Sequence, residues 1–322
     1  MVDHMQKKIV KFNTPWNHSF LKDQINPTIT EFQFEIDNDC KECDYWIIWG
    51  DLPTMQEKMS VICDPKNVIY MTDEAYVEKT FDPKFLNQFT TVISLRDDIS
   101  HPNIIKSHEI NTWHLKKKFK EVYNNEPIEK TKLISLVCSD LTIIPGHKKR
   151  FALVNKLIGH FKDRLDVYGS GFNYIEDKWD ALAPYKYSIA IENSSIPGYF
   201  TEKISECYLA HTYPIYYGAP DIATYFDPTL LSVIDVDDYK KSIDVIERLL
   251  HADPYGKIQD LLIEQKLLYL DKYQLFSALS KIMLNNSSSI ENESKVNTIR
   301  AHRTYSKHYK LKKVINYIRK KN

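Results

Sequence analysis

The chain has 322 residues, of which 43% are apolar, so it is long enough to form two domains of ordinary size with buried cores. Its formal net charge is zero, so the overall charge gives no indication of an acidic partner, and no nucleic-acid-binding motif accompanies the basic residues. No stretch approaches the roughly 18 to 20 apolar residues of a spanning helix, and residues 1–10 lack the apolar region of a signal peptide. We therefore expect a cytoplasmic protein with five free thiols.

Residues 1–125 are predicted to form an N-terminal Rossmann-like domain. The first strand is not followed by a Gly-rich dinucleotide fingerprint, which argues against a nicotinamide enzyme. The pair Cys40 and Cys43 has no second pair of ligands in the sequence, so packing is favoured over a zinc or redox site. Four apolar runs predict buried parallel strands at residues 8–12, 45–49, 68–71 and 91–95.

A group of carboxylates follows the third of these strands. Asp73 and Glu74 come directly after it, at the end of the strand where open α/β sheets place active-site groups. From its position alone, Glu74 fits either an active-site base or a solvated turn residue. Asp73 and Glu78 are neighbouring carboxylates with the same chemistry.

A charged stretch from Trp113 onward predicts a helix, followed by an interdomain linker at residues 126–132. The C-terminal Rossmann-like domain is then expected over residues 133–285, beginning with a buried strand at 133–138. Past this strand, basic residues stand at the start of an amphipathic helix, where they suit either phosphate binding or a solvated turn. These residues are Lys148, Lys149 and Arg150.

The stretch between residues 187 and 220 predicts a strand, a polar loop, a helix beginning near Glu202 and a second strand. Thr201 is placed to cap this helix, and Lys203 lies in its first turn, where a cation is unfavourable for the helix dipole. An anion beside Lys203 is therefore expected. The alternative interpretation is a capped helix with a solvated Glu-Lys pair. Side chains able to bond sugar hydroxyls share this loop, namely Glu192, Asn193, Tyr199 and Glu202.

This stretch resembles the donor-binding signature of the α1,3/4-fucosyltransferases of bacterial type, which transfer fucose from GDP-fucose. The matching residues are Glu192-Asn193-Ser194, Tyr199-Phe200-Thr201-Glu202-Lys203, Pro214 and Gly218, with Tyr185-Lys186-Tyr187 before them and Tyr225-Phe226-Asp227-Pro228 after them. The resemblance implies an α/β fold of the GT-B class, with two facing Rossmann-like domains and a cleft between them. It implies that the C-terminal domain binds the donor and that the N-terminal domain binds the acceptor.

The resemblance also implies roles for individual residues. Arg150 and Lys203 are expected to contact the donor diphosphate, where a planar guanidinium suits bidentate phosphate contact. Asn193, Tyr199 and Glu202 are expected to contact the ribose, the fucose or the nucleotide. Glu74 is the best match to the family's catalytic glutamate, and residues 96–99 resemble its arginine and aspartate cluster.

The implied reaction is transfer of fucose with inversion to a hydroxyl of an N-acetylglucosamine or glucose unit, through an α1,3 or α1,4 link. The acceptor would be an oligosaccharide or glycolipid, such as lipopolysaccharide. Neither a metal nor a cofactor is expected, because two cations and a helix N-terminus can stabilise the leaving diphosphate. Asp235-Val236-Asp237 has the form of a metal-binding Asp-x-Asp motif, but its position favours a strand-end turn.

Two alternative functions remain open, a transferase for another GDP-sugar and a non-catalytic GDP-sugar-binding protein. The final segment, residues 286–322, is predicted to be a basic tail, because residues 294–322 contain ten Lys or Arg and no acidic residue. This tail fits peripheral contact with the inner face of the cytoplasmic membrane, docking on the N-terminal domain, or a solubilising segment.

Overall fold

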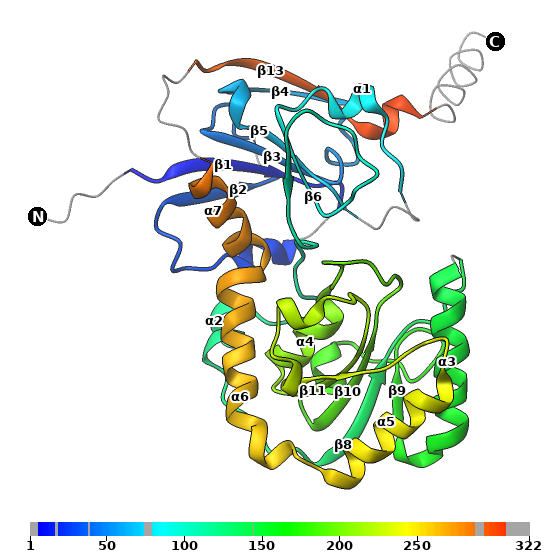
Figure 1. Cartoon of the computed structure of the whole chain (residues 1–322). Helices are drawn as coiled ribbons and strands as arrows, with labels where there is room; N and C mark the ends of the chain where they lie inside the picture. Colours follow the sequence, from blue (N-terminus) through cyan, green and yellow to red (C-terminus); the bar gives the residue numbers. More distant parts are fainter. Residues whose placement is uncertain are drawn as a thin grey trace, which may run out of the picture. The chain divides into compact units, whose positions relative to one another are not determined.

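The computed structural model describes residues 6–16, 19–37, 39–73, 79–143, 145–286 and 293–306 (Figure 1). The chain divides into two compact units. Unit 1 consists of residues 1–107 together with 280–322, and unit 2 consists of residues 108–279. Glu74 and Glu78 lie outside the described residues, and so do residues 307–322 of the predicted basic tail.

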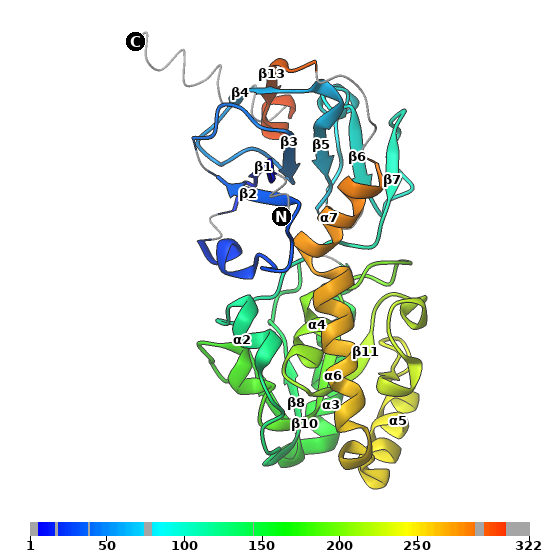
Figure 2. The ribbon, with the colours of Figure 1, turned by 90° about the vertical axis from the view of Figure 1, so that its left-hand side faces the viewer.

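Unit 1 is built on a six-stranded parallel sheet with the order β2-β1-β3-β5-β6-β7, in which β5, β6 and β7 run side by side (Figure 2). The central strands β3 and β5 are buried along their whole length, as apolar parallel strands covered on both faces require. The four strands predicted here are confirmed, whereas β2 and β7 were not predicted. The bounds are β1 (Lys8–Asn13), β2 (Phe32–Ile36), β3 (Tyr45–Trp49), β5 (Val68–Met71), β6 (Thr91–Ser94) and β7 (Ile104–Lys106).

The residues after 293 complete unit 1. Strand β13 (Lys295–Arg300) pairs antiparallel with β4 (Lys58–Cys63), and the two lie side by side in Figure 1. Beyond β13, the backbone N–H of His302 donates to the Asp51 carboxylate at 2.7 Å, and Arg303 forms an ion pair with Asp51 at 3.3 Å. Residues 293–306 therefore follow the docking alternative rather than forming a free tail.

The helical segments of unit 1 are short. Helix α1 (Pro83–Leu86) begins at a proline, and the Asp82 carboxylate caps it by accepting from the N–H of Lys84 at 2.8 Å. Three 3₁₀ turns cover Ser19–Gln24, Pro65–Asn67 and His302–Tyr305.

Unit 2 is a five-stranded parallel sheet with the order β12-β11-β10-β8-β9. Strands β8 and β10 are neighbours, and the chain runs outward from them in opposite directions, so the sheet has a topological switch point between them. Strand β12 has only two residues, and a 3₁₀ turn at Pro228–Leu230 precedes it. The bounds are β8 (Lys132–Val137), β9 (Asp166–Tyr168), β10 (Tyr185–Ile191), β11 (Tyr213–Tyr217) and β12 (Ser232–Val233).

Helices cover this sheet, with α3 packed against α5 and α4 against α6 (Figure 1). The helix predicted from Arg150 begins earlier, at Pro145, because proline is tolerated in the first turn. A π-helical turn at Tyr269–Tyr273 separates α6 from α7. The bounds are α2 (Phe119–Asn124), α3 (Pro145–Phe161), α4 (Glu202–Leu209), α5 (Tyr239–Ala252), α6 (Tyr255–Leu268) and α7 (Leu275–Asn285), with further 3₁₀ turns at Lys162–Arg164, Lys178–Ala181 and Ile222–Thr224.

The unit boundaries differ from the predicted domains. The first boundary lies at 107/108 instead of 126–132, because the segment predicted as helix and linker belongs to the core of unit 2. Trp113, Phe119 and Val122 are buried in that core. The second boundary lies at 279/280 instead of 285.

The five cysteines are free thiols, as predicted. Cys43 and Cys63 are buried in the core of unit 1, which supports packing as the role of Cys43. A search of the described part of the chain finds no helix that is long and apolar enough to cross a membrane.

Candidate functional site

The polar side chains singled out in the sequence gather at the switch point of unit 2. Strand β8 leads to Ser139, and strand β10 leads to Glu192 and Asn193. Helix α4 brings Lys203 in its first turn, and helix α3 brings Arg150. The carboxyl ends of the strands on either side of a switch point form the usual ligand site of an open α/β sheet.

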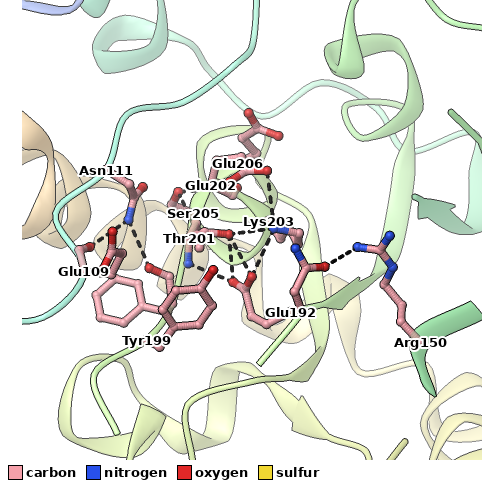
Figure 3. A network of polar contacts seen from close by, with 12 residues as sticks. Glu109, Asn111, Arg150, Glu192, Tyr199, Thr201, Glu202, Lys203, Ser205 and Glu206 are labelled. Carbon is pink, nitrogen blue, oxygen red and sulfur yellow. Dashed lines mark hydrogen bonds and ion pairs between the residues drawn. The ribbon is translucent and has the colours of Figure 1, made fainter. Parts of the chain in front are cut away.

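Arg150 is fixed at the edge of this site. Its guanidinium is buried and donates to the side-chain oxygen of Asn193, and to the Ser139 hydroxyl at 3.1 Å. Figure 3 labels Arg150 at the edge of the polar network. The Nε of Arg150 is also buried and has no hydrogen-bond partner among the described residues. Lys149 instead pairs with Asp237 at 2.8 Å. Arg150 is therefore the predicted basic residue whose side chain is bonded to the loop after β10, through Asn193.

The approach of helix α3 to Asn193 depends on Gly146. A Cβ atom at Gly146 would lie 1.8 Å from the backbone oxygen of Asn193, far inside van der Waals contact. The first turn of α3 therefore touches the loop backbone directly, and this contact brings Arg150 within reach of Asn193.

The resemblance implies that this site binds GDP. Replacing Gly146 by alanine is then expected to push the first turn of α3 away from the loop and to weaken GDP binding by about tenfold or more, through displacement of Arg150. Isothermal calorimetry with GDP measures the effect. Gly159→Ala is the matched control in the same helix, because no atom lies within 4 Å of a Cβ added there. Equal GDP affinity in the two variants would contradict the assigned role of the close contact.

Glu192 lies at the centre of the hydrogen-bond network. Its carboxylate is completely buried and accepts from the backbone N–H of Thr201 at 2.7 Å and from the Thr201 hydroxyl at 2.8 Å (Figure 3). It also forms an ion pair with Lys203 at 3.0 Å. Burial raises the pKa of Glu192 above its ordinary value, although Lys203 acts in the opposite direction.

Two expectations about the start of α4 are modified by this network. Thr201 occupies the N-cap position as predicted, but its side chain does not cap the helix. The anion expected beside Lys203 is present within the chain itself, because Glu192 lies at 3.0 Å and Glu202 at 3.5 Å from its ammonium. Burial would lower the pKa of Lys203, but these two carboxylates outweigh it and raise the pKa above its ordinary value, so the side chain stays charged.

Lys178 and Glu206 extend the site on the side of α4 and were not predicted. Lys178 lies 3.1 Å from Glu206 and 3.4 Å from Glu202, and the carboxylate of Glu206 also accepts from the backbone N–H of His114. Although burial opposes it, the positive charges of Lys203 and Lys178 hold the pKa of Glu202 well below its ordinary value. Glu202 and Glu206 are four residues apart, so their position on the same face of a helix could have been predicted from the sequence.

A cavity of about 270 Å³ opens among these groups. Both candidate phosphate ligands, Arg150 and Lys203, line it, together with Lys178 and Glu202. Its remaining wall includes backbone and small side chains from the ends of β8 and β10 and from the turn after β9. The arrangement can receive an anionic group at its mouth and hydroxyl groups beside the carboxylates.

The other predicted site residues are distributed as follows. Tyr199 is buried in the loop before α4, and it is not among the residues that line the cavity. Asp73 forms an ion pair with Lys79 at 2.6 Å. These two residues stand on either side of residues 74–78 in the sequence. Arg96 is buried in unit 1 and bonds Asp98 at 2.6 Å.

The Asp-x-Asp sequence forms a turn, in which Asp235 accepts from the backbone N–H of Asp237 at 2.9 Å. Asp237 is also the partner of Lys149. Within the ranges that the structure describes, no three His, Cys, Asp or Glu side chains gather closely enough to hold a metal ion.

Comparison with known proteins gives a family match over part of the chain. Residues 127–255 match the glycosyltransferase family 10 (fucosyltransferase) C-terminal family. An α-(1,3)-fucosyltransferase of Helicobacter pylori is 36% identical over 128 residues, 38% of this chain, and an α-(1,4)-fucosyltransferase of Arabidopsis thaliana is 33% identical over 107 residues, 31% of it. Each match spans about a quarter of the relative's own length, 26% in both cases. Over residues 127–255, this match agrees with the family predicted from the donor-binding signature.

The fold has a counterpart among solved structures. An α1,3-fucosyltransferase crystallised with GDP superposes with a TM-score of 0.53 at 21% identity, over 89% of this chain and 94% of that one. A second α1,3-fucosyltransferase structure gives a TM-score of 0.51 at 19% identity, over 80% and 82%. This likeness concerns the fold, and it confirms the predicted α/β class and its GT-B type.

Proposed function

Because residues 127–255 belong to the glycosyltransferase family 10 fucosyltransferase C-terminal family, we propose that this protein transfers L-fucose from GDP-fucose to a sugar hydroxyl. Unit 2 binds the donor at the switch point between β8 and β10. Arg150 and Lys203 contact the diphosphate, and Glu202 and Asn193 contact the ribose or the sugar. Tyr199 supports the loop from its buried position and contacts the donor if the loop rearranges on binding.

The observation that carries this proposal is the convergence of two cations from different helices on one cavity. Arg150 has a buried Nε without a partner in the described chain, and Lys203 is held charged by its carboxylate neighbours. As the glycosidic bond breaks, negative charge collects on the departing diphosphate, and fixed cations stabilise that charge without reorganisation. The same site would bind the diphosphate of the donor before the reaction.

Glu74 is proposed as the catalytic base. It would deprotonate the acceptor hydroxyl, whose oxygen then attacks the anomeric carbon on the side opposite to GDP, so the reaction inverts that carbon. The ion pair between Asp73 and Lys79 supports this choice, because it leaves the Asp73 carboxylate already engaged with a cation. Lys79 also donates to the backbone oxygen of Gly50 at 3.1 Å, at the end of the neighbouring strand β3.

The acceptor is proposed to be an N-acetylglucosamine or glucose unit of a glycan, linked α1,3 or α1,4. Metal-free catalysis is part of the proposal, because Arg150 and Lys203 offer the positive charge that a divalent ion supplies in other nucleotide-sugar enzymes. Peripheral contact with a membrane through the basic residues after Ser306 also stays a prediction.

Transfer from GDP-fucose to lactosamine-type and lacto-type acceptors, assayed in chelator, tests these points together. We expect a fucosylated product by mass, with its linkage read by NMR, and we expect Glu74→Gln to lower kcat by at least about a thousandfold while GDP affinity changes by less than about threefold. The matched control is Glu176→Gln, because Glu176 is an exposed residue paired with Lys116.

Three other results would each contradict part of the proposal. Activity that returned only with added metal would exclude metal-free catalysis. Transfer from another GDP-sugar in place of GDP-fucose would change the donor. GDP binding without transfer to any acceptor would favour a non-catalytic GDP-sugar-binding protein.

A further inference from the structure

The positive charges of the proposed donor site are balanced by the protein's own carboxylates. Two lysines and three carboxylates are joined by ion pairs of 3.5 Å or less, and a third cation, the Arg150 guanidinium, lines the same cavity and is bonded to neutral groups. A bound diphosphate adds at least two negative charges to this neutral set. The carboxylates and the donor diphosphate therefore compete for the same cations when the donor enters. The cations are Arg150, Lys178 and Lys203, and the carboxylates are Glu192, Glu202 and Glu206.

Lys203 is the cation that the carboxylate and the donor have to share. Its ammonium has three N–H groups that can donate. The nitrogen lies 3.0 Å from the Glu192 carboxylate, 2.9 Å from the Thr201 hydroxyl and 3.5 Å from the Glu202 carboxylate. Contact with a phosphate oxygen requires at least one of these partners to be given up.

Taking this ammonium away affects Glu192 more than the other two carboxylates. Glu202 keeps Lys178 at 3.4 Å, and Glu206 keeps Lys178 at 3.1 Å. Glu192 is completely buried, and its remaining partners are the neutral N–H and hydroxyl groups of Thr201. A carboxylate that is buried without a cation is unstable relative to its protonated form.

We propose that Glu192 positions the Lys203 ammonium before the donor binds and takes up one proton from solvent when the donor diphosphate takes that ammonium over. Glu192 is thus a positioning residue, since it acts on the donor through Lys203. This inference rests on the proposed function only in taking a nucleotide diphosphate as the ligand. The proton neutralises the Glu192 carboxylate, which would otherwise stay buried without a cation.

The groups packed around Glu192 offer no other replacement for the ammonium. From β11, the Tyr216 hydroxyl donates its proton to the backbone oxygen of Tyr199 at 3.4 Å. From α3, the Arg150 guanidinium is engaged by Asn193 and Ser139. From α4, Glu202 adds negative charge. Gly218 closes the remaining side, where a Cβ would lie 2.5 Å from Cγ of Glu192.

Proton uptake fixes the direction of the pH dependence. A complex that binds one more proton than its separate components becomes more stable as pH falls, so donor affinity should decrease as pH rises through the range in which Glu192 titrates. The donor must be a GDP-sugar, because its diphosphate carries no titrating terminal phosphate. Free GDP would add its own ionisation near neutral pH, with the opposite effect on affinity.

The test is calorimetric titration with GDP-fucose at one pH near 6, in two buffers with different enthalpies of ionisation. The difference in binding enthalpy gives the number of protons exchanged, and we expect uptake of about one proton per donor bound. In Glu192→Gln the uptake should fall to about zero, while the amide still accepts from the N–H of Thr201 and donates to its hydroxyl. The exposed Glu176→Gln variant should keep the wild-type value.

A second measurement on the wild-type protein covers the case in which Glu192→Gln does not fold. Infrared difference spectra on donor binding should show a protonated carboxyl band that is absent from the free protein. Binding of GDP-fucose with no proton uptake, or uptake that persists in Glu192→Gln, would overturn the inference and leave the donor site intact. Failure of every GDP-sugar to bind would instead overturn the proposed function, and this inference with it.

Discussion

Replacing Lys203 by methionine is expected to lower kcat/KM with GDP-fucose by about a thousandfold, the effect of removing one fixed electrostatic contact from a transition state. The same change should also destabilise unit 2. It leaves the buried carboxylate of Glu192 without its cation at 3.0 Å, and removing one member of a buried ion pair costs about 3–5 kcal/mol, less whatever protonation recovers. Steady-state kinetics and urea unfolding measure the two effects.

The two roles of Lys203 separate in a double variant. Combining Lys203→Met with Glu192→Gln removes both charges, so most of the lost stability should return while activity stays low. Lys149→Met is the matched control, because Lys149 is exposed, pairs with Asp237 and lies next to Arg150 in the sequence. If the double variant were as unstable as the single one, Glu192 would not be the partner that Lys203 stabilises.

Ending the chain at Asn286 is expected to unfold unit 1 while unit 2 stays folded. The truncation removes β13, so β4 loses its pairing partner and the buried side chains of Ile299 and Ala301 leave the core of unit 1. It also leaves the buried carboxylate of Asp51 without its bonds to His302 and Arg303. Together these losses should exceed about 3 kcal/mol, a large part of the stability of an ordinary domain. Limited proteolysis with mass analysis locates the unfolded unit.

A second truncation, ending at Ser306, is the control for this result. It keeps β13 and Arg303, so the free energy of unfolding should remain within about 1 kcal/mol of the wild-type value. Equal stability of the Asn286 and wild-type chains would show that the pairing of β13 with β4 contributes nothing to unit 1.

The sequence predicted the parallel strands well because their apolar runs are continuous. The runs at 45–49, 68–71 and 213–217 coincide with β3, β5 and β11. It failed for strands whose partners decide their structure. Strand β13 reads as a polar basic stretch, and it is ordered by pairing with β4, which lies more than 200 residues earlier in the chain. No local periodicity carries that information.

The candidate site was predictable to the extent that topology alone gathers it. Arg150, Asn193 and Lys203 follow strands or begin helices at one edge of the sheet, so the βα order placed them together. The partnership of Glu192 with Lys203 was not predicted, because the loop between them could take many paths. The helix-dipole argument did indicate an anion at Lys203, but the sequence could not show whether the protein or a ligand provides it.

The interrupted course of unit 1 along the chain also fixes the order in which the two units can be completed during synthesis. Unit 2 is one continuous segment, residues 108–279, and β13 is made only after all of it. Since domains fold as their residues leave the ribosome, unit 2 can reach its native state before β13, the pairing partner of β4, has been synthesised. A chain released prematurely at that stage would carry a folded unit 2 and an incomplete unit 1.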